Sequence, residues 1–150
     1  MPLISNIEIL EKPEQPIIFI RVQTSVSDLP KAIGSNYEKL EAYLKKNGRY
    51  LADIPFVSFY SFEDMNNMDV AMGFPLAAPL KGGGEIESGV IAAGKVISCM
   101  YLGPYDQMGP VYDQVMKQIE EKGYKLVYPT YEFYYNGPEV PAEHYLTELR

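Results

Sequence analysis

The sequence is poor in the residues that disulfide frameworks and metal sites require. It contains one cysteine, Cys99, one histidine, His144, and no tryptophan. A single cysteine cannot form a disulfide within the chain and fits a reducing compartment, so we expect a cytoplasmic protein. A single histidine excludes a multi-histidine metal site, and we expect neither a metal nor a cofactor.

Long apolar runs and an excess of basic residues are also missing. No apolar stretch approaches the roughly 20 residues that a membrane-spanning helix needs, and the N-terminal segment does not have the pattern of a signal peptide. Lys and Arg number 13 against 20 Asp and Glu, which gives a net charge of -7. This acidic balance argues against a phosphate backbone as partner, so we expect no direct nucleic acid binding and no membrane binding.

Aromatic residues, by contrast, are plentiful. The 150 residues are 47% hydrophobic and include 13 tyrosines and 6 phenylalanines. This length and composition predict a single domain over residues 1–150 with a substantial core, and no separate DNA-binding domain. The tyrosines supply flat apolar faces that each end in a polar tip.

Hydrophobic patterning predicts the same order of elements, strand, helix, strand, strand, twice along the chain. The expected strands are at 17–22, 56–60 and 68–74 in the first half and at 96–101, 131–135 and 145–149 in the second, with helices at 35–48 and 110–123.

The two halves can be laid over each other. Residues 37–51 match residues 112–126 with an offset of 75, and allowing one deletion Phe59 then falls on Phe133. We interpret this as an internal duplication.

The duplicated units are expected at about residues 5–80 and 85–150, joined through Gly82, Gly83 and Gly84 and a hairpin at 85–90. The expected fold is α+β: duplicated βαββ units with antiparallel sheets, one helix per unit, and a central ligand cleft between the halves.

One carboxylate, Glu132, interrupts the aromatic run YPTYEFYY at residues 128–135. Successive side chains of a strand point to opposite faces. We expect the more apolar face to pack against the helices and the mixed face to line the cleft. The more apolar face carries Tyr131, Phe133 and Tyr135 with Val57 and Phe59. The mixed face carries Thr130, Glu132 and Tyr134 with Phe56, Ser58 and Tyr60.

A carboxylate in an aromatic cleft has two functional uses. Glu132 could neutralise a cationic ligand whose flat body stacks on tyrosines, or it could act as a general acid or base with a tyrosine hydroxyl such as Tyr134. The structural alternative is a carboxylate in solvent, or one paired with a lysine. Glu148 in the last strand is a second candidate, although alternation prevents Glu148 and Tyr145 from facing the cleft together. Cys99 reads as a buried, inert thiol.

Several short motifs follow one another in residues 68–149. They are D-x-x-x-G-x-P (Asp69, Gly73, Pro75), Gly94-Lys95, G-P-Y (Gly103, Pro104, Tyr105), E-x-Y (Glu132, Phe133, Tyr134) followed by Asn136, Gly137 and Pro138, and T-E-L (Thr147, Glu148, Leu149). In their order and spacing these motifs resemble the GyrI-like small-molecule-binding domain, also known as the effector-binding domain of AraC-type and MerR-type multidrug regulators. The resemblance covers about residues 5–150.

The resemblance implies a SOUL-like duplicated βαββ fold that binds hydrophobic, often cationic compounds, with Glu132 meeting the positive charge. It also implies an aromatic clamp carried by Tyr134, Tyr60, Tyr101 and Tyr145. We expect a stand-alone small-molecule-binding protein. Two alternatives remain: a hydrolase of cyclopropanoid or related electrophilic toxins that uses Glu132 and a tyrosine, and a protein that binds gyrase or a regulator.

Overall fold

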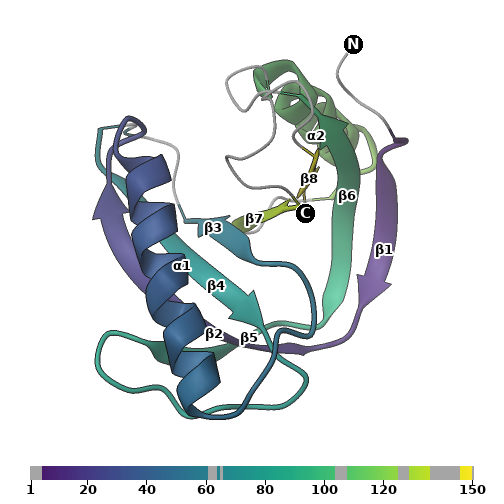
Figure 1. Cartoon of the computed structure of the whole chain (residues 1–150). Helices are drawn as coiled ribbons and strands as arrows, with labels where there is room; N and C mark the ends of the chain where they lie inside the picture. Colours follow the sequence, from purple (N-terminus) through teal and green to yellow (C-terminus); the bar gives the residue numbers. More distant parts are fainter. Residues whose placement is uncertain are drawn as a thin grey trace.

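The computed structural model describes residues 5–60, 64, 66–103, 108–124, 129–135 and 146–149. Within these residues the chain forms two helices and eight strands, which confirms the predicted α+β class with one helix in each half (Figure 1). The elements are β1 (Glu8–Lys12), β2 (Gln15–Thr24), α1 (Leu29–Lys46), β3 (Phe56–Phe59), β4 (Met68–Pro75), β5 (Glu87–Ile91), β6 (Gly94–Leu102), α2 (Gly109–Glu121), β7 (Thr130–Tyr134) and β8 (Leu146–Leu149).

The strands belong to one antiparallel sheet with the order β1-β6-β8-β7-β3-β4-β2-β5. The chain enters the sheet at one edge and its two halves meet at the centre, where β7 of the second half pairs with β3 of the first. The second half does not form a separate sheet, so the two predicted units share a single layer of strands.

Both helices follow the predicted amphipathic pattern. Leu40 and Leu44 are buried on one side of α1 and Ile119 on one side of α2, at the spacing that places side chains on a common helix face. Each helix is followed by a glycine with a left-handed backbone, Gly48 at φ 64° and Gly123 at φ 74°. Glycine adopts this conformation without steric cost, and it ends a helix.

Two strands depart from the sequence-based prediction. Strand β1 was not expected, because its sequence EILEK is half polar and it lies at the edge of the sheet, where one side needs no apolar cover. The hairpin expected at 85–90 is displaced: the tight turn lies between Gly83 and Ile86, and residues 87–91 form β5, which pairs with β2.

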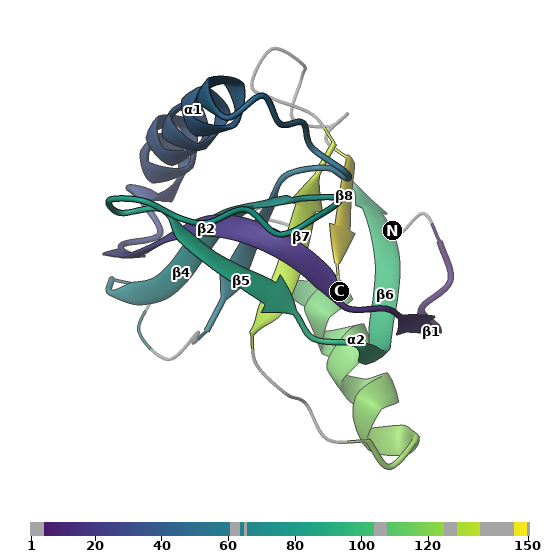
Figure 2. The same cartoon turned by 90° about the horizontal axis from the view of Figure 1, so that it is seen from below.

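Two long, bent strand pairs connect the halves. Strands β1 and β2 are separated only by Pro13 and Glu14, and β5 and β6 only by Ala92 and Ala93. Because β1 pairs with β6 and β2 pairs with β5, this ribbon runs from the α1 side of the molecule to the α2 side (Figure 2). The sheet is strongly curved as a result.

The two helices cover the same face of the sheet, which we call the helix face. Cross-strand neighbours point to one side, and the pairing register carries one such row from β2 to β6 (Figure 1). The first-half end of the row packs with Leu40 of α1, and the second-half end packs with Val111 of α2. The row consists of Ile20, Met72, Val57, Glu132 and Cys99, and it crosses β8 between the last two.

The opposite side, which we call the far face, has its own apolar cluster. Phe56 and Phe133 are directly opposed across β3 and β7, with ring centroids 5.4 Å apart, and both are buried. Ile17 completes the buried set, and Tyr131 packs against it. The sheet is therefore buried on both faces at its centre.

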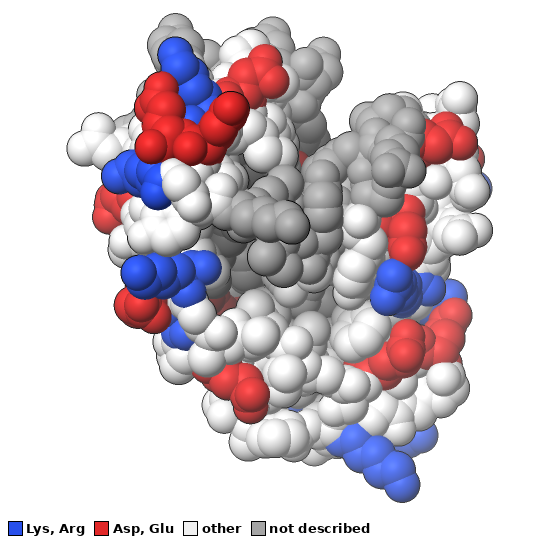
Figure 3. Space-filling model, turned by 180° about the vertical axis from the view of Figure 1, so that it is seen from behind, with Lys and Arg blue, Asp and Glu red and all other residues white. Residues whose placement is uncertain are grey.

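Charged residues of both signs are interspersed on the flanks of the molecule in Figure 3, without a large single-sign patch in that view. Neither α1 nor α2, the helices of the described chain, combines the length and the apolar character that a membrane crossing requires.

Candidate functional site

The centre of the helix face is the pair Val57 and Glu132. These residues oppose each other in the β3–β7 register, and they are 75 residues apart, the same offset that relates Tyr37 of α1 to Tyr112 of α2. The duplication that relates the two halves therefore places Val57 and Glu132 at equivalent positions, and these two residues are also direct neighbours across the strands. Glu132 therefore lies where the two halves of the sheet meet, between the two helices.

The predicted strand faces are therefore right for β3, where Val57 and Phe59 pack in the core under α1, and wrong for β7. Tyr131 and Phe133 lie on the far face, while Glu132 shares the helix face with Val57 and Phe59. The sequence alignment introduced a one-residue deletion before the strand, and the structure keeps the offset of 75 unchanged. A slip of one residue moves every side chain of a strand to the other face.

Glu132 is held by two tyrosine hydroxyls. The hydroxyl of Tyr112, from α2, donates to Oε2, and the hydroxyl of Tyr134 donates to Oε1 at 2.7 Å. Glu132 is 7% exposed. Among the described residues, no lysine, arginine or histidine lies within ion-pair distance of it. The carboxylate is therefore satisfied by neutral donors, and its charge is not balanced by a cation.

The surroundings raise the pKa of Glu132, Tyr112 and Tyr134. Burial raises the pKa of Glu132, and the hydrogen bonds from Tyr112 and Tyr134 oppose that rise. Burial and the neighbouring Glu132 charge raise the pKa of both tyrosines well above the ordinary value. Tyr37 of α1 adds to the rise at Tyr134, which places it close to the same cluster. Each helix thus brings one tyrosine toward the central carboxylate.

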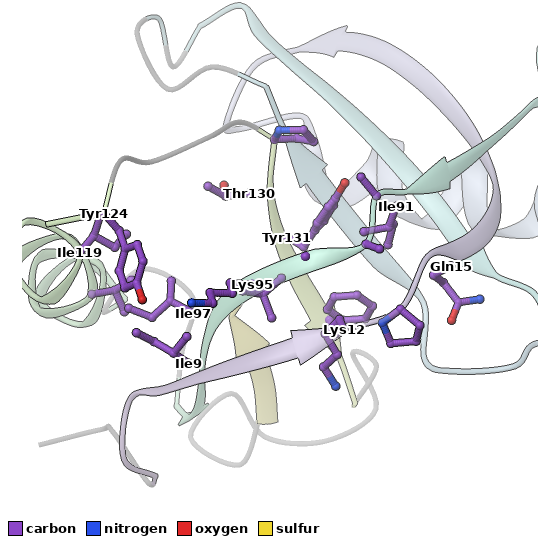
Figure 4. A pocket seen from close by; sticks show the side chains of 18 of the residues that line it. Ile9, Lys12, Gln15, Ile91, Lys95, Ile97, Ile119, Tyr124, Thr130 and Tyr131 are labelled. Carbon is purple, nitrogen blue, oxygen red and sulfur yellow. The ribbon is translucent and has the colours of Figure 1, made fainter. Parts of the chain in front are cut away.

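A cavity of about 560 Å³ lies beside this cluster. Strand β8 pairs with β6 from Cys99 to Leu102, and in the described part of the chain no strand separates the first half of β6 from the start of β7. The cavity occupies this opening under α2 (Figure 4). Its apolar walls include Ile9, Ile91, Ile97, Val115, Met116 and Ile119.

Tyr112 connects the cavity to the carboxylate. It lines the cavity and donates its hydroxyl to Glu132, whereas Glu132 is not among the described lining residues. A volume of this size with mostly apolar walls is typical of small-molecule sites. A ligand in the cavity would contact the Tyr112 ring, with the Glu132 carboxyl group directly behind the hydroxyl.

The remaining predicted ligand-binding residues do not gather at Glu132. Tyr60 stacks under the guanidinium of Arg21, 3.8 Å from the ring centroid, and Phe56 packs on the far face. Tyr101 is fully buried under α2 with Cys99 and does not line the cavity. Tyr145 lies outside the described residues. Of the tyrosines named from the sequence that the structure describes, Tyr134 is the one with a hydrogen bond to Glu132.

Glu148 is buried on the far face, opposite Phe133 in the β7–β8 register. It accepts hydrogen bonds from the Ser98 hydroxyl at 3.0 Å and from the Tyr135 hydroxyl at 3.4 Å. The two buried glutamates are therefore on opposite sides of the sheet. Cys99 is buried as predicted, and burial raises the pKa of its thiol to about 11, so it is an unreactive side chain.

Tyr112 was missed as a site residue because it reads as part of the apolar stripe of α2. A signal was present in the duplication: Tyr112 matches Tyr37, and each is the first residue of its matched segment, 112–126 and 37–51. Two tyrosines at equivalent positions, each brought toward the centre of one sheet, could have been placed at the meeting point of the halves.

An α+β domain with two helices over one face of a curved sheet, and an apolar cavity beside a buried carboxyl group, is a small-molecule-binding domain by fold and site. The chain belongs to the GyrI-like family: the profile of the GyrI-like small molecule binding domain matches residues 5–150. The resemblance expected from the motifs is thereby confirmed. Among curated proteins, no sequence matches the chain.

Three solved structures illustrate the fold. EcmrR in its complex with DNA superposes with a TM-score of 0.82 at 24% identity, over 96% of this chain and 55% of that chain, so this chain spans about half of EcmrR. SAV2435 bound to tetraphenylphosphonium gives 0.59 at 13% identity, over 97% and 92%. A hydrolase from Listeria innocua gives 0.67 at 14% identity, over 95% and 89%. At these identities the likeness shows the fold alone.

Proposed function

We propose that this protein binds hydrophobic aromatic cations in the cavity under α2, with Glu132 supplying the negative charge. The observation that carries the proposal is the Glu132 carboxyl group, buried behind Tyr112 without a cationic partner among the described residues. Ionising a buried carboxyl group that has only neutral donors is costly, and a ligand cation beside it would offset that cost.

The cavity supplies the other half of the recognition. Tyr112 presents an aromatic ring to the cavity, and a cation over such a ring gains roughly 0.5–2 kcal/mol from the ring quadrupole. The apolar walls suit an aryl body, and SAV2435 of the same fold has been solved with tetraphenylphosphonium, a compound of this class. The net charge of the chain, -7, favours the approach of cations.

Hydrolysis has less support as the function. Both oxygens of Glu132 accept hydrogen bonds from tyrosine hydroxyls, and the residue does not line the cavity. A general base must reach the proton that it abstracts, and Tyr112 stands between Glu132 and a substrate in the cavity. One of the structural neighbours is named a hydrolase, but at 14% identity this supports a shared fold and no shared chemistry.

Calorimetric titration with tetraphenylphosphonium, and with neutral triphenylphosphine oxide as the uncharged probe, tests the proposal. We expect the phosphonium to bind and Glu132→Gln to weaken its binding by about tenfold or more, because the substitution keeps the shape and removes the charge. Binding of the phosphine oxide should change little.

Glu148→Gln is the matched control, since it removes a second buried carboxylate from the far face of the same sheet. It should leave phosphonium binding unchanged. Equal losses in the two variants, or undiminished binding by Glu132→Gln, would show that the cation does not depend on Glu132.

A further inference from the structure

One end of the cavity carries hydrogen-bond donors and a positive charge that the cation proposal does not use. Lys95 extends from β6 toward Tyr124, the residue that follows the turn after α2, and its Nζ lies 5.6 Å from the centroid of the Tyr124 ring (Figure 4). Both residues line the cavity. Tyr124 is 47% exposed, so this end is the mouth of the cavity.

The Lys95 charge is not neutralised within the described part of the chain. Glu11 is its direct cross-strand neighbour in the β1–β6 register, yet the two side chains form no ion pair, and the ammonium lies over the aromatic ring instead. Among the described lining residues, the other charged groups are Lys12 and Asp53. Asp53 already accepts a hydrogen bond from the amide of Ile54. The Lys95 ammonium therefore lies at the cavity without an ion pair to a described carboxylate.

A second donor lies deeper in the same cavity. The hydroxyl of Thr130 is buried, with the residue 8% exposed, and it has no hydrogen-bond partner among the described residues. Thr130 lines the cavity at the start of β7. A buried hydroxyl without a partner costs stability, and an acceptor atom on a ligand would remove that cost.

We propose that the preferred ligand carries an anionic group, of the carboxylate class, which binds at Lys95 and the Tyr124 hydroxyl, in addition to the cationic group that faces Tyr112 and Glu132. The cavity then recognises a zwitterionic amphiphile: an apolar body with opposite charges toward its two ends. This inference rests on the proposed function for the cationic end, and on separate residues for the anionic end.

The chemistry at the mouth fits a carboxylate better than a neutral acceptor. An ammonium and a phenol hydroxyl supply donors to both oxygens of one carboxylate, and hydrogen bonds to an ionised acceptor are about twice as strong as neutral ones. The walls between Tyr112 and Lys95 are apolar, so the body of the ligand needs no further polar groups except an acceptor for Thr130.

Two fluorescent dyes that differ in one group test the inference. Rhodamine 110 carries a free carboxylate and is zwitterionic, whereas rhodamine 123 is its methyl ester and is a plain cation. Fluorescence anisotropy should show tighter binding of rhodamine 110, by about fivefold. A fivefold ratio corresponds to the contribution of an exposed ion pair, so Lys95→Gln should reduce the ratio of the two affinities to about one.

Lys81→Gln removes an equally exposed lysine outside the cavity and controls for the change in net charge. It should keep the preference. Equal affinity for the two dyes in the unsubstituted protein, or a preference that survives Lys95→Gln, would overturn the anionic subsite.

Glu132→Gln separates this inference from the proposed function. If both hold, the substitution weakens both dyes by the same factor and the preference for rhodamine 110 remains. If Glu132→Gln has no effect while the preference still depends on Lys95, the cationic proposal fails and the anionic subsite stands.

Discussion

Glu132 is a carboxyl group whose protonation depends on the fold around it. Burial raises its pKa above the ordinary value of 4.5, more than the hydrogen bonds from Tyr112 and Tyr134 lower it. An acid with a higher pKa in the folded than in the unfolded state binds its proton more tightly when folded. Its contribution to stability is therefore complete below about pH 4.5 and is lost as the pH rises through the folded pKa.

We expect this loss to appear as a difference between the unsubstituted protein and Glu132→Gln, which cannot titrate at this position. The free energy of unfolding of the former, relative to the latter, should fall by at most about 1.4 kcal/mol per pH unit across that window. Urea denaturation at a series of pH values from about 4 upward measures the difference. A difference that is flat, or that grows with pH, would contradict a raised pKa.

At the scale of single residues, the sequence identified the carboxylate but not all of its partners. Glu132 stood out because a charge among aromatics is costly unless it has a use. Tyr134 followed from alternation along the same strand. Tyr112 could not be found in this way, because its contact with Glu132 depends on how α2 lies over the sheet, and periodicity within a helix does not specify that placement.

Gly73 of β4 lies so close to the Phe56 ring of β3 that the position has no room for a side chain. A Cβ on Gly73 of β4 would overlap the ring of Phe56, which covers it from the far face. Gly73→Ala should therefore lower the free energy of unfolding by about 1–3 kcal/mol, since extra atoms in a packed core force side chains out of their preferred positions.

Gly34 in α1 provides the matched opposite case. A Cβ there meets no atom within 4 Å, and its backbone is helical. Gly34→Ala should raise the free energy of unfolding by about 0.5–1 kcal/mol, because alanine loses less backbone entropy in a helix. Chemical denaturation of the two variants compares the same substitution in two elements, and changes of the same sign would contradict the packing described for Gly73.

At the scale of elements, the helices and most strands were predictable from the sequence, but the two faces of β7 were not. Helix periodicity tolerates an error of a residue at either end, whereas a strand does not, because its side chains alternate with a period of two. The deletion that aligned Phe59 with Phe133 was enough to exchange the two faces of β7. Strand β5 was not among the expected strands, since its partner β2 is distant in the sequence and no local pattern identifies the pairing.

At the scale of the whole molecule, the bent ribbon ties the two halves together. Strands β1 and β2 are nearly continuous, as are β5 and β6, and each pair contributes to both ends of the sheet. One half cannot unfold without breaking strands that the other half uses. We therefore expect a single cooperative unfolding transition.

The absence of tryptophan makes this expectation easy to measure. Tyr43→Trp places a reporter against the cluster under α1, and Tyr124→Trp places one beside α2. Urea transitions followed by the fluorescence of the two variants should coincide with those followed by circular dichroism of the same variant. Separate midpoints for fluorescence and circular dichroism within a variant would show that the halves unfold independently.

The pair of Val57 and Glu132 at the centre of the sheet also gives the site a direction. Opposed side chains on neighbouring strands lie about 4.5–5.5 Å apart, so two carboxylates there would repel each other. The second half supplies the carboxyl group and the first half supplies an apolar side chain at the equivalent position. The two halves of the fold correspond, but the site between them is asymmetric, so a bound ligand has one preferred orientation.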